Sequence, residues 1–431
     1  MMSLGAERVL DERTTPVRQE AWSAPRAATA TLTGPAIWLM SSNLVYVGLQ
    51  WAALVGLAKL GAPVALGRVG LALAVVTPVV LITGFSLRAY QATDVLRRYA
   101  FAEYLNLRLV ANVAAAAIIW AASSLAREEE AAVAVLIPIA GAKLAEATCE
   151  TCYGLAQRHD RMRFIALSRV ARGAFGFAAL VAVVALGGTL AAGCWALAAA
   201  WLVFLVAVDL PVASTLEPLF VRPRIATLAR LAHETAPLGA VTGVFSIAQS
   251  VPRYLLQLTH GAAAVGYFTA LSAFIPAIGQ LATSVCHAAA PRLGWNAAGD
   301  AGRYRTLVLQ LLGAGMAGMV LMTLGAAVVG PRFLSLVYTE EYAGYHATFV
   351  VIVVAAALGM MNEVLYFALV AARKLRVQLG VQCLGLAVTA LAGAALIPRF
   401  GVGGAAFALA LAAGATVVAS AWLVLARRGG R

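Results

Sequence analysis

Long apolar segments follow one another through almost the whole chain and leave little room for any other structure. A helix that crosses the roughly 30 Å hydrocarbon core of a bilayer needs about 20 mainly apolar residues. Twelve segments of this kind, bounded by charged or turn residues, cover 34–58, 69–90, 104–126, 131–156, 164–186, 190–210, 232–252, 262–290, 306–329, 346–371, 377–397 and 401–426. The pattern predicts an all-α integral membrane protein with about twelve transmembrane helices.

The charged residues are too few to coat a water-soluble protein of this size. They make up 12% of the 431 residues, whereas 62% are apolar; soluble domains carry about 25% charged residues. Disordered chains are poor in apolar residues, so the same composition excludes disorder.

Lysine and arginine alternate between rich and poor loops along the chain. The N-terminal tail, the even-numbered loops with the adjoining ends of their spans, and the C-terminal tail together carry 25 of the 32 basic residues, with four around the second loop and five around the fourth. Cytoplasmic loops are the basic ones in membrane proteins, so both termini are predicted to be cytoplasmic. This placement explains the net charge of +13 without a nucleic-acid partner.

The loops define the domain organisation. We expect a cytoplasmic tail at 1–33, an N-terminal lobe at 34–210, a cytoplasmic linker at 211–231, a C-terminal lobe at 232–426 and a second tail at 427–431. No loop is long enough for a catalytic domain, and the GxxxxGK[ST] phosphate-binding motif is absent from the sequence. A transporter is therefore favoured over an enzyme.

The two predicted lobes contain similar motifs in the same order. These are Glu150-x-x-Tyr153 and Glu363-x-x-Tyr366, Gly188 and Gly401, and Gly67 and Gly266. Six spans in each half, starting on the same side, predict parallel repeats, and transporters of this kind bind substrate between the repeats.

Several segments resemble a known family. They are the run from Arg253-Tyr254 to Tyr267, YGLAQRHDRM from residue 153, FLSLVYTEEY from residue 333, and IPRFGVGGAA from residue 397. They are similar to the Wzx-like oligosaccharide flippases, which are polysaccharide export proteins of the MOP (multidrug, oligosaccharidyl-lipid and polysaccharide exporter) superfamily. One position departs from the family, because Pro252 stands where relatives often have Asp.

The resemblance implies a MOP/MATE-like fold with two six-helix lobes around a V-shaped cavity. It implies a flippase that moves undecaprenyl-pyrophosphate-linked oligosaccharide units from the cytoplasmic to the periplasmic leaflet of the bacterial inner membrane by alternating access. The products would feed capsule, O-antigen or exopolysaccharide assembly, with a polymerase or other assembly proteins as partners. No cofactor or metal is expected, and coupling to the membrane potential, to H⁺ or to Na⁺ stays open.

Ionisable and polar residues inside the predicted spans are the candidates for binding, because they are costly there unless they face a cavity or a partner. The candidate cavity residues are Asn43, Tyr46, Gln50, Lys143, Glu146, Glu150, Arg253 and Glu363. Lys143, Glu146 and Glu150 share one helix face because they are spaced at i, i+3 and i+7.

Structural roles are open for the same residues. Lys143 and Glu146 are spaced for an internal ion pair, Glu150 and Glu363 for bracing the basic residues of the following loops, and Arg253 for reaching the membrane interface. The loop cations Arg97, Arg98, Arg158, Arg161 and Arg163 are candidates for a cytoplasmic mouth that gathers anionic lipid, although orientation alone also explains them.

Three other functions compete with the oligosaccharide flippase. One is a lipid II flippase, for which a longer chain with extra spans would be expected. A cation-coupled multidrug exporter of the same superfamily should concentrate acids in one cavity, and the first span contains no acid. A polyprenol-dependent polymerase or ligase usually has a long polar loop for its acceptor, which the sequence lacks.

Overall fold

The computed structural model describes residues 34–425 except for 62, 95–96, 126–129, 223 and 373–374. The tails predicted at 1–33 and 427–431 lie outside the described residues. The N-terminal half contains α1 (Gly34–Leu60), α2 (Pro63–Thr83), α3 (Leu87–Thr93), α4 (Phe101–Leu125), α5 (Glu130–Arg158), α6 (Met162–Ala185), α7 (Leu190–Phe204), the π-helical turn η1 (Leu205–Asp209) and α8 (Leu210–Leu216). The C-terminal half contains α9 (Ile225–Ser272), α10 (Ile275–Gly299), α11 (Ala301–Val337), α12 (Glu340–Ala343), α13 (His346–Ala371) and α14 (Leu375–Leu425).

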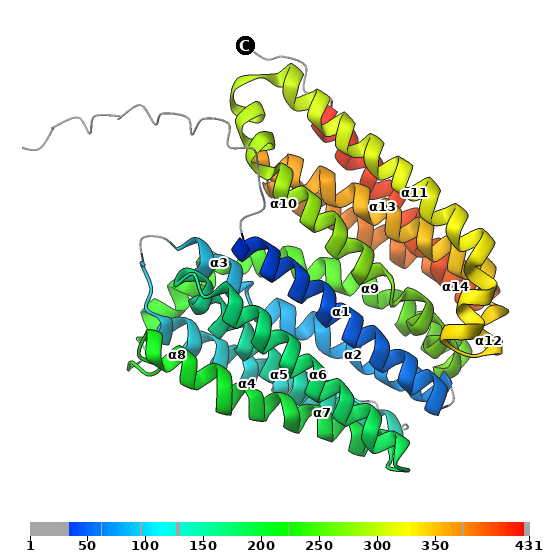
Figure 1. Ribbon diagram of the computed structural model, residues 1–431, viewed down its shortest axis with the longest axis horizontal. Coiled ribbons are helices and arrows are strands. Elements are labelled where there is room, and N and C mark those ends of the chain that lie inside the picture. Colours follow the sequence, from blue (N-terminus) through cyan, green and yellow to red (C-terminus); the bar gives the residue numbers. More distant parts are fainter. Residues whose placement is uncertain are drawn as a thin grey trace, which may run out of the picture. The chain divides into compact units, whose positions relative to one another are not determined.

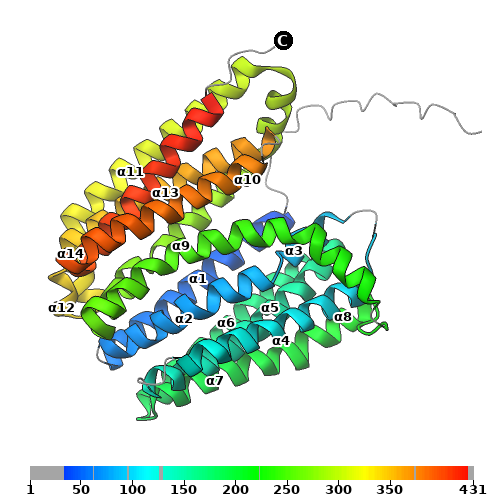
Figure 2. The ribbon, with the colours of Figure 1, turned by 180° about the vertical axis from the view of Figure 1, so that it is seen from behind.

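Among the described residues, ten helical segments are long and apolar enough to cross a membrane. Two of them, Ile225–Thr283 and Val377–Leu425, are 59 and 49 residues long and hold two of the expected spans each. The chain reverses within them at Gly261 (φ 76°) and Gly401 (φ 54°), a backbone region that glycine enters without steric cost. Both reversals are visible in Figure 2. The expected all-α membrane fold is confirmed.

The second expected span, 69–90, is wrong at both ends. In the structure α2 begins at Pro63 and ends at Thr83. Phe85 (φ 52°) and Ser86 (φ 50°) adopt left-handed backbone conformations, which separate α2 from the short helix α3. The expected span runs through this break because residues 69–90 contain a single charged side chain, Arg88. The loop expected between 252 and 262 is also wrong, since α9 stays helical up to Gly261.

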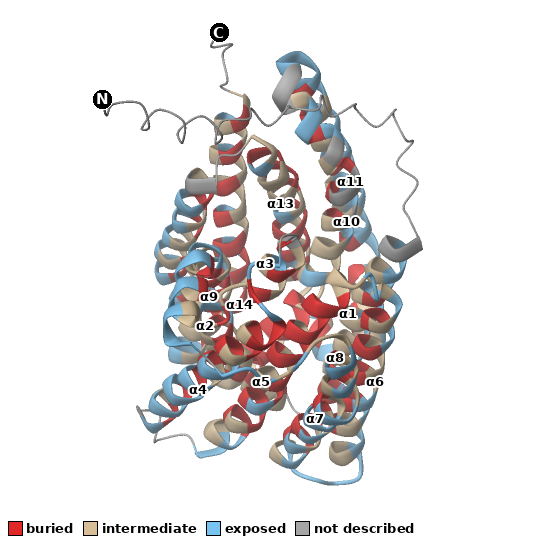
Figure 3. Ribbon diagram, turned by 90° about the vertical axis from the view of Figure 1, so that its left-hand side faces the viewer, coloured by how far each residue is buried: buried red, intermediate tan, exposed pale blue. Residues whose placement is uncertain are grey.

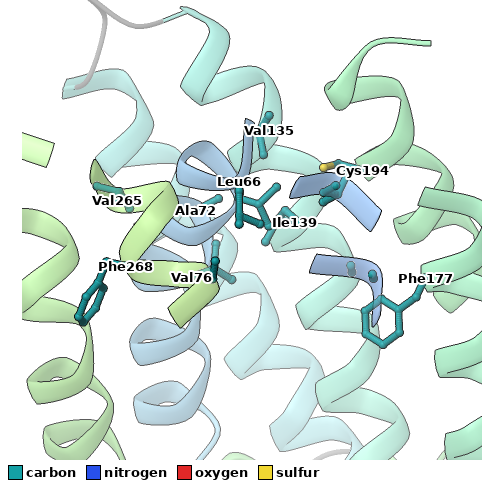
Figure 4. Packing of buried hydrophobic residues seen from close by; sticks show 14 of the residues in the cluster. Leu66, Ala72, Val76, Val135, Ile139, Phe177, Cys194, Val265 and Phe268 are labelled. Carbon is teal, nitrogen blue, oxygen red and sulfur yellow. The ribbon is translucent and has the colours of Figure 1, made fainter. Parts of the chain in front are cut away.

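The helices pack in two groups that share α9. In the N-terminal half α1 packs on α6, α6 on α7, and α5 on α2 and α7; in the C-terminal half α13 packs on α10, α11 and α14. Helix α9 packs along both α2 and α14 (Figure 1), so it joins the two groups. One apolar cluster follows this path, with Leu66, Ala72 and Val76 of α2 between residues of α5 and the Val265 and Phe268 side of α9 (Figure 4).

Gly67 of α2 and Gly266 of α9 meet at the crossing of these two helices. A Cβ atom on Gly67 would overlap the carbonyl oxygen of Ala262, and one on Gly266 would overlap that of Pro63. Each overlapped carbonyl belongs to the residue four positions before the other glycine, so the contact is symmetric. Two residues that the sequence pairs as repeat equivalents therefore contact each other at the centre of the fold.

Replacing Gly67 by alanine is expected to destabilise the protein by about 3 kcal/mol, the upper end of the usual overpacking cost, because the overlapping atoms are backbone and cannot move aside. Thermal unfolding in detergent should show a lower midpoint. Gly325→Ala on α11 is the matched control, since nothing lies within 4 Å of its added Cβ. Equal midpoints for the two variants would contradict the close crossing.

Apolar side chains cover the outer faces of the bundle. Helix α11 exposes Leu321, Leu324 and Val328, and α4 exposes Val113 and Trp120. Figure 3 shows the opposite arrangement inside, where buried residues gather in the middle of the molecule. An exposed apolar belt of this extent fits a lipid environment.

Candidate functional site

A row of charged side chains on α5 faces α1, α3 and α6. Lys143, Glu146 and Glu150 lie on one side of α5, as their spacing predicts, and each forms an ion pair. Helix α5 holds them firmly because its other faces are largely buried against its neighbours.

Glu146 accepts hydrogen bonds from three side chains. Its Oε2 lies 2.7 Å from Lys143 Nζ, and its Oε1 lies 2.5 Å from the Tyr46 hydroxyl and 3.3 Å from Arg172 Nη2. The Arg172 guanidinium stacks 4.7 Å from the Trp201 ring centroid and is completely buried. The pair expected between Lys143 and Glu146 is present, but it belongs to a larger cluster.

Glu150 joins two arginines from different helices. Its Oε1 accepts from Arg169 Nη2 at 2.6 Å, and its Oε2 accepts from Arg88 of α3. Arg169 also donates to Asn43 Oδ1 of α1. Both guanidiniums lie over the Tyr153 ring, at 5.9 Å for Arg88 and 5.6 Å for Arg169.

We call these six residues, Arg88, Lys143, Glu146, Glu150, Arg169 and Arg172, the charge network. It holds four cations and two carboxylates, so two positive charges remain unbalanced. Arg108 is also buried beside the network, where it donates to Thr151 Oγ1 at 3.2 Å and to the Gly84 carbonyl at 2.9 Å, and it is not counted in this surplus. The side chains of Glu150 and Arg88 are 27% and 22% exposed, so an anion can approach this end of the network.

Gln50 and Tyr46 line a small cavity beside the network, together with Lys143, Phe177 and Trp201. The cavity has a volume of about 40 Å³. This is room for about three water molecules, at roughly 10–15 Å³ each. The structure therefore brings Asn43, Tyr46, Lys143, Glu146 and Glu150 together, but the cavity beside Gln50 is too small for a sugar.

Arg253 lies apart from the network, on α9. Its guanidinium donates to the Gln249 carbonyl at 3.0 Å and to Ser272 Oγ at 3.2 Å, and it stacks over Phe268 at 5.4 Å. Its Nε is buried without a partner. No acidic side chain pairs with Arg253 within the described part of the chain, so its charge is uncompensated there.

Glu363 lies on α13, where its carboxylate accepts from Thr283 Oγ1 at 3.3 Å. It is not part of the charge network. The basic residues that were expected to be braced by it, Lys374 and Arg376, have side chains outside the described residues.

Four of the expected mouth residues, Arg97, Arg98, Arg161 and Arg163, are exposed. Arg163 stacks over Trp38 at 5.3 Å. Arg158 differs, because its side chain is mostly buried and pairs with Glu217 at 3.5 Å. A bracing role therefore accounts for Arg158.

Three network residues, Arg88, Arg169 and Arg172, are absent from the sequence-based candidates. In the sequence they are grouped with the basic residues around the second and fourth loops. The structure places Arg88 in α3 and Arg169 and Arg172 in α6. The spacing of Arg169 and Arg172 is a usable signal, because residues at i and i+3 share one helix face.

Hydrogen bonds join the two halves at the end of the molecule where α1 ends. Trp51 Nε1 donates to the Tyr338 hydroxyl at 3.0 Å, and this hydroxyl donates to the Ala270 carbonyl at 2.9 Å. We call Trp51, Tyr338 and Ala270 the clasp. Lys59 Nζ donates to the Leu336 carbonyl at 3.1 Å beside it.

Solved structures of MOP-superfamily transporters share this fold. The lipid II flippase MurJ in an inward closed conformation aligns with a TM-score of 0.72 at 10% identity, covering 91% of this chain and 87% of that one. An inward-facing multidrug resistance MATE transporter aligns with a TM-score of 0.67 at 15% identity, covering 90% and 96%. A MOP-superfamily transporter from Pyrococcus furiosus, described as having a binding pocket of reverse polarity, aligns with a TM-score of 0.59 at 14% identity, covering 91% and 96%. The protein therefore has the MOP-superfamily transporter fold.

The family is shown by sequence. The family model described as "Polysaccharide biosynthesis protein" matches residues 33–295, which is more than half of the chain. The chain belongs to this polysaccharide biosynthesis family. No curated protein matches it.

Proposed function

We propose that the protein is a flippase for lipid-linked oligosaccharides. Its substrate would be an undecaprenyl-pyrophosphate-linked repeat unit, taken from the cytoplasmic leaflet of a bacterial inner membrane and released in the periplasmic leaflet. Both termini then lie in the cytoplasm, and the unit passes to a polymerase or other assembly proteins. The protein itself carries out no covalent chemistry.

The two unbalanced positive charges of the charge network carry this proposal. A diphosphate bears about two negative charges at neutral pH, so it complements the surplus of Arg88, Lys143, Arg169 and Arg172 over the two glutamates. Arginine guanidiniums suit phosphate oxygens because they donate two hydrogen bonds in parallel. The sugar hydroxyls need a polar interior for the same passage, since each costs roughly 4–8 kcal/mol to transfer to alkane.

Arg253 supports a path for the anion through the fold. It lies eight residues before the reversal at Gly261, which is about 12 Å along the helix and near the predicted periplasmic side. An uncompensated cation there provides a second binding position for the diphosphate. Two negative charges moving outward gain roughly 4–5 kcal/mol per 100 mV of inside-negative potential, at about 2.3 per charge.

The charge balance also separates this proposal from its main rival. An exporter of lipophilic cations needs excess acid in its cavity, whereas the network has excess base. A polymerase or ligase would need a catalytic group beside an acceptor site. The network offers paired ions and aromatic rings, which suit binding rather than group transfer.

The direct test of this function uses a strain that lacks the gene. Undecaprenyl-linked saccharides would be extracted, quantified by mass spectrometry and assigned to a leaflet. We expect complete repeat units to accumulate on the cytoplasmic side and to return to normal on complementation. An unchanged pool with normal sidedness would overturn the proposal and favour drug export.

We further propose that the clasp closes the periplasmic side in this conformation. Tyr338→Phe removes the hydrogen bonds to Trp51 and Ala270, which are worth about 1 kcal/mol each. The open state should become about 10-fold more populated or more. Spin labels at Leu60→Cys and Leu336→Cys, in a background without native cysteines, should show a larger long-distance population by double electron-electron resonance.

Tyr267→Phe is the matched control for the clasp. The Tyr267 hydroxyl donates to Glu341 at 3.0 Å, and both residues belong to the C-terminal half, so this bond does not join the halves. Its loss should leave the distance distribution unchanged. Equal distributions for Tyr338→Phe and the parent would refute the clasp.

A further inference from the structure

Asp209 is a buried carboxyl group that the charge network does not use. It ends the π-helical turn η1, between α7 and α8, and its relative exposure is 0%. Such turns add one residue to a helical turn and occur frequently at functional sites. The turn places an acid inside an apolar span, where ionisable residues are costly and generally functional.

The hydrogen bonds of Asp209 are incomplete. Its Oδ1 accepts from Ser168 Oγ at 2.5 Å, and Ser168 shares a hydrogen bond of 3.0 Å with the Tyr153 hydroxyl. Its Oδ2 is buried and has no hydrogen bond of regular geometry among the described residues, although the Cys149 thiol of α5 lies close enough to interact with the carboxylate. An ionised carboxylate in this state is costly inside an apolar span, so the site favours either a proton or a movable cation.

Arg172 supplies the movable cation. It lies one turn beyond Ser168 on α6, is fully buried, and interacts electrostatically with Asp209. Its Nη2 donates to Glu146 at 3.3 Å, the longest of the Glu146 hydrogen bonds. Its Nε and Nη1 are buried without a hydrogen-bond partner among the described residues. One arginine thus stands between two carboxyl groups and can satisfy more atoms than it does now.

We propose that Asp209 is a proton-binding site linked to anion binding at the charge network. With a proton on Asp209, Arg172 belongs to the network and adds to its positive surplus. Without the proton, Asp209 draws the free Nε and Nη1 groups of Arg172 and lowers the surplus by one charge. Protonation therefore strengthens anion binding, and by linkage anion binding takes up a proton. This inference rests on the proposed function for the identity of the anion.

The other titratable groups around Asp209 do not replace it in this role. Helix α5 brings Cys149, Cys152 and Tyr153 toward it, and α6 brings Arg172. Helix α7 adds only Cys194 as a titratable group, and α8 adds none. Glu146 and Glu150 each pair with two cations, so a proton would have to displace both.

The experiment uses the purified full-length protein, inorganic pyrophosphate as the probe, and calorimetric titration in two buffers of different ionisation enthalpy. The wild type should take up more protons per anion bound than Asp209→Asn, by up to one. Asn cannot be protonated, so this variant should show only the pH dependence that the ionisation of pyrophosphate itself causes. The affinity of the wild type should fall by a further factor of about 5 to 150 from acidic to alkaline solution, the usual range of coupling between sites.

Asp160→Asn is the matched control, because Asp160 is exposed and should leave proton uptake as in the wild type. Asp209→Ser provides a smaller replacement if the Asp209→Asn variant fails to fold. Equal proton uptake by the wild type and both Asp209 variants would overturn the inference.

Absence of pyrophosphate binding by the wild type would count against the proposed function instead. In that case, infrared difference spectroscopy between acidic and alkaline solution tests the protonation of Asp209 independently of anion binding. A protonated-carboxyl band that disappears in Asp209→Asn supports the proton site. A band that is unchanged in this variant overturns it.

Discussion

Arg88→Gln is expected to slow the translocation of lipid-linked oligosaccharide by about 10- to 100-fold, because a charge-assisted hydrogen bond is worth about 1.5–3 kcal/mol. Arg88 is the network arginine on the short helix α3, and its partly exposed side chain is available to an anion. Glu150 keeps Arg169 as a partner at 2.6 Å in this variant, so the fold should persist. The rate would be measured in proteoliposomes with labelled substrate in the outer leaflet.

Arg303→Gln is the matched control for this loss. It removes the same charge on the same predicted side of the membrane, but its side chain is 82% exposed and pairs with Asp300 at the start of α11. Its translocation rate should stay within about two-fold of the wild type, because exposed ion pairs contribute about 0–1 kcal/mol. An unimpaired Arg88→Gln would exclude the charge network as the diphosphate site.

The membrane fold follows closely from hydropathy and the distribution of basic residues, whereas the ends of helices do not. Residues 346–371 coincide with α13, because charged or turn residues mark both ends. The break after α2 could not be predicted from hydropathy, since it depends on the left-handed backbone conformations of Phe85 and Ser86. Local backbone conformation decides such breaks, and an average over 20 residues cannot register it.

The site was predictable where it depends on spacing along one helix. Lys143, Glu146 and Glu150 could be placed on one face from the helical period alone. Their partners could not, because Arg88 and Arg172 come from other helices and look like the basic residues that orient membrane proteins. Only the packing of α3 and α6 against α5 shows that these arginines face inward.

The internal repeat accounts for part of the helix packing but for little of the charge network. Gly67 and Gly266 meet at the central crossing, as repeat equivalents on a symmetry axis should. Glu150 and Glu363, another pair of repeat equivalents, have different surroundings. Glu150 pairs with two arginines, whereas Glu363 accepts a hydrogen bond from a threonine. The halves therefore share a scaffold but differ in charge, which places the proposed anion site in one half.

Glu150→Gln is expected to cause a large loss of stability. Arg88 and Arg169 would both lose their carboxylate and remain as neighbouring cations inside the membrane domain. Breaking a buried ion pair costs about 3–5 kcal/mol. The lower end, about 3 kcal/mol, is expected here because the Glu150 side chain is 27% exposed. Thermal unfolding in detergent should show a clearly lower midpoint.

A second substitution separates charge imbalance from loss of packing. In Glu150→Gln with Arg169→Gln one of the two stranded cations is gone, so part of the lost stability should return, although Arg169 also loses its contact with Asn43. Glu340→Gln, at an exposed position of α12, is the control and should leave the midpoint unchanged. If the double variant were no more stable than Glu150→Gln, stranded charge would not be the cause. Recovery would instead show that Glu150 holds two arginines together and that the positive surplus, which Arg88→Gln reduces, is kept in place by this carboxylate.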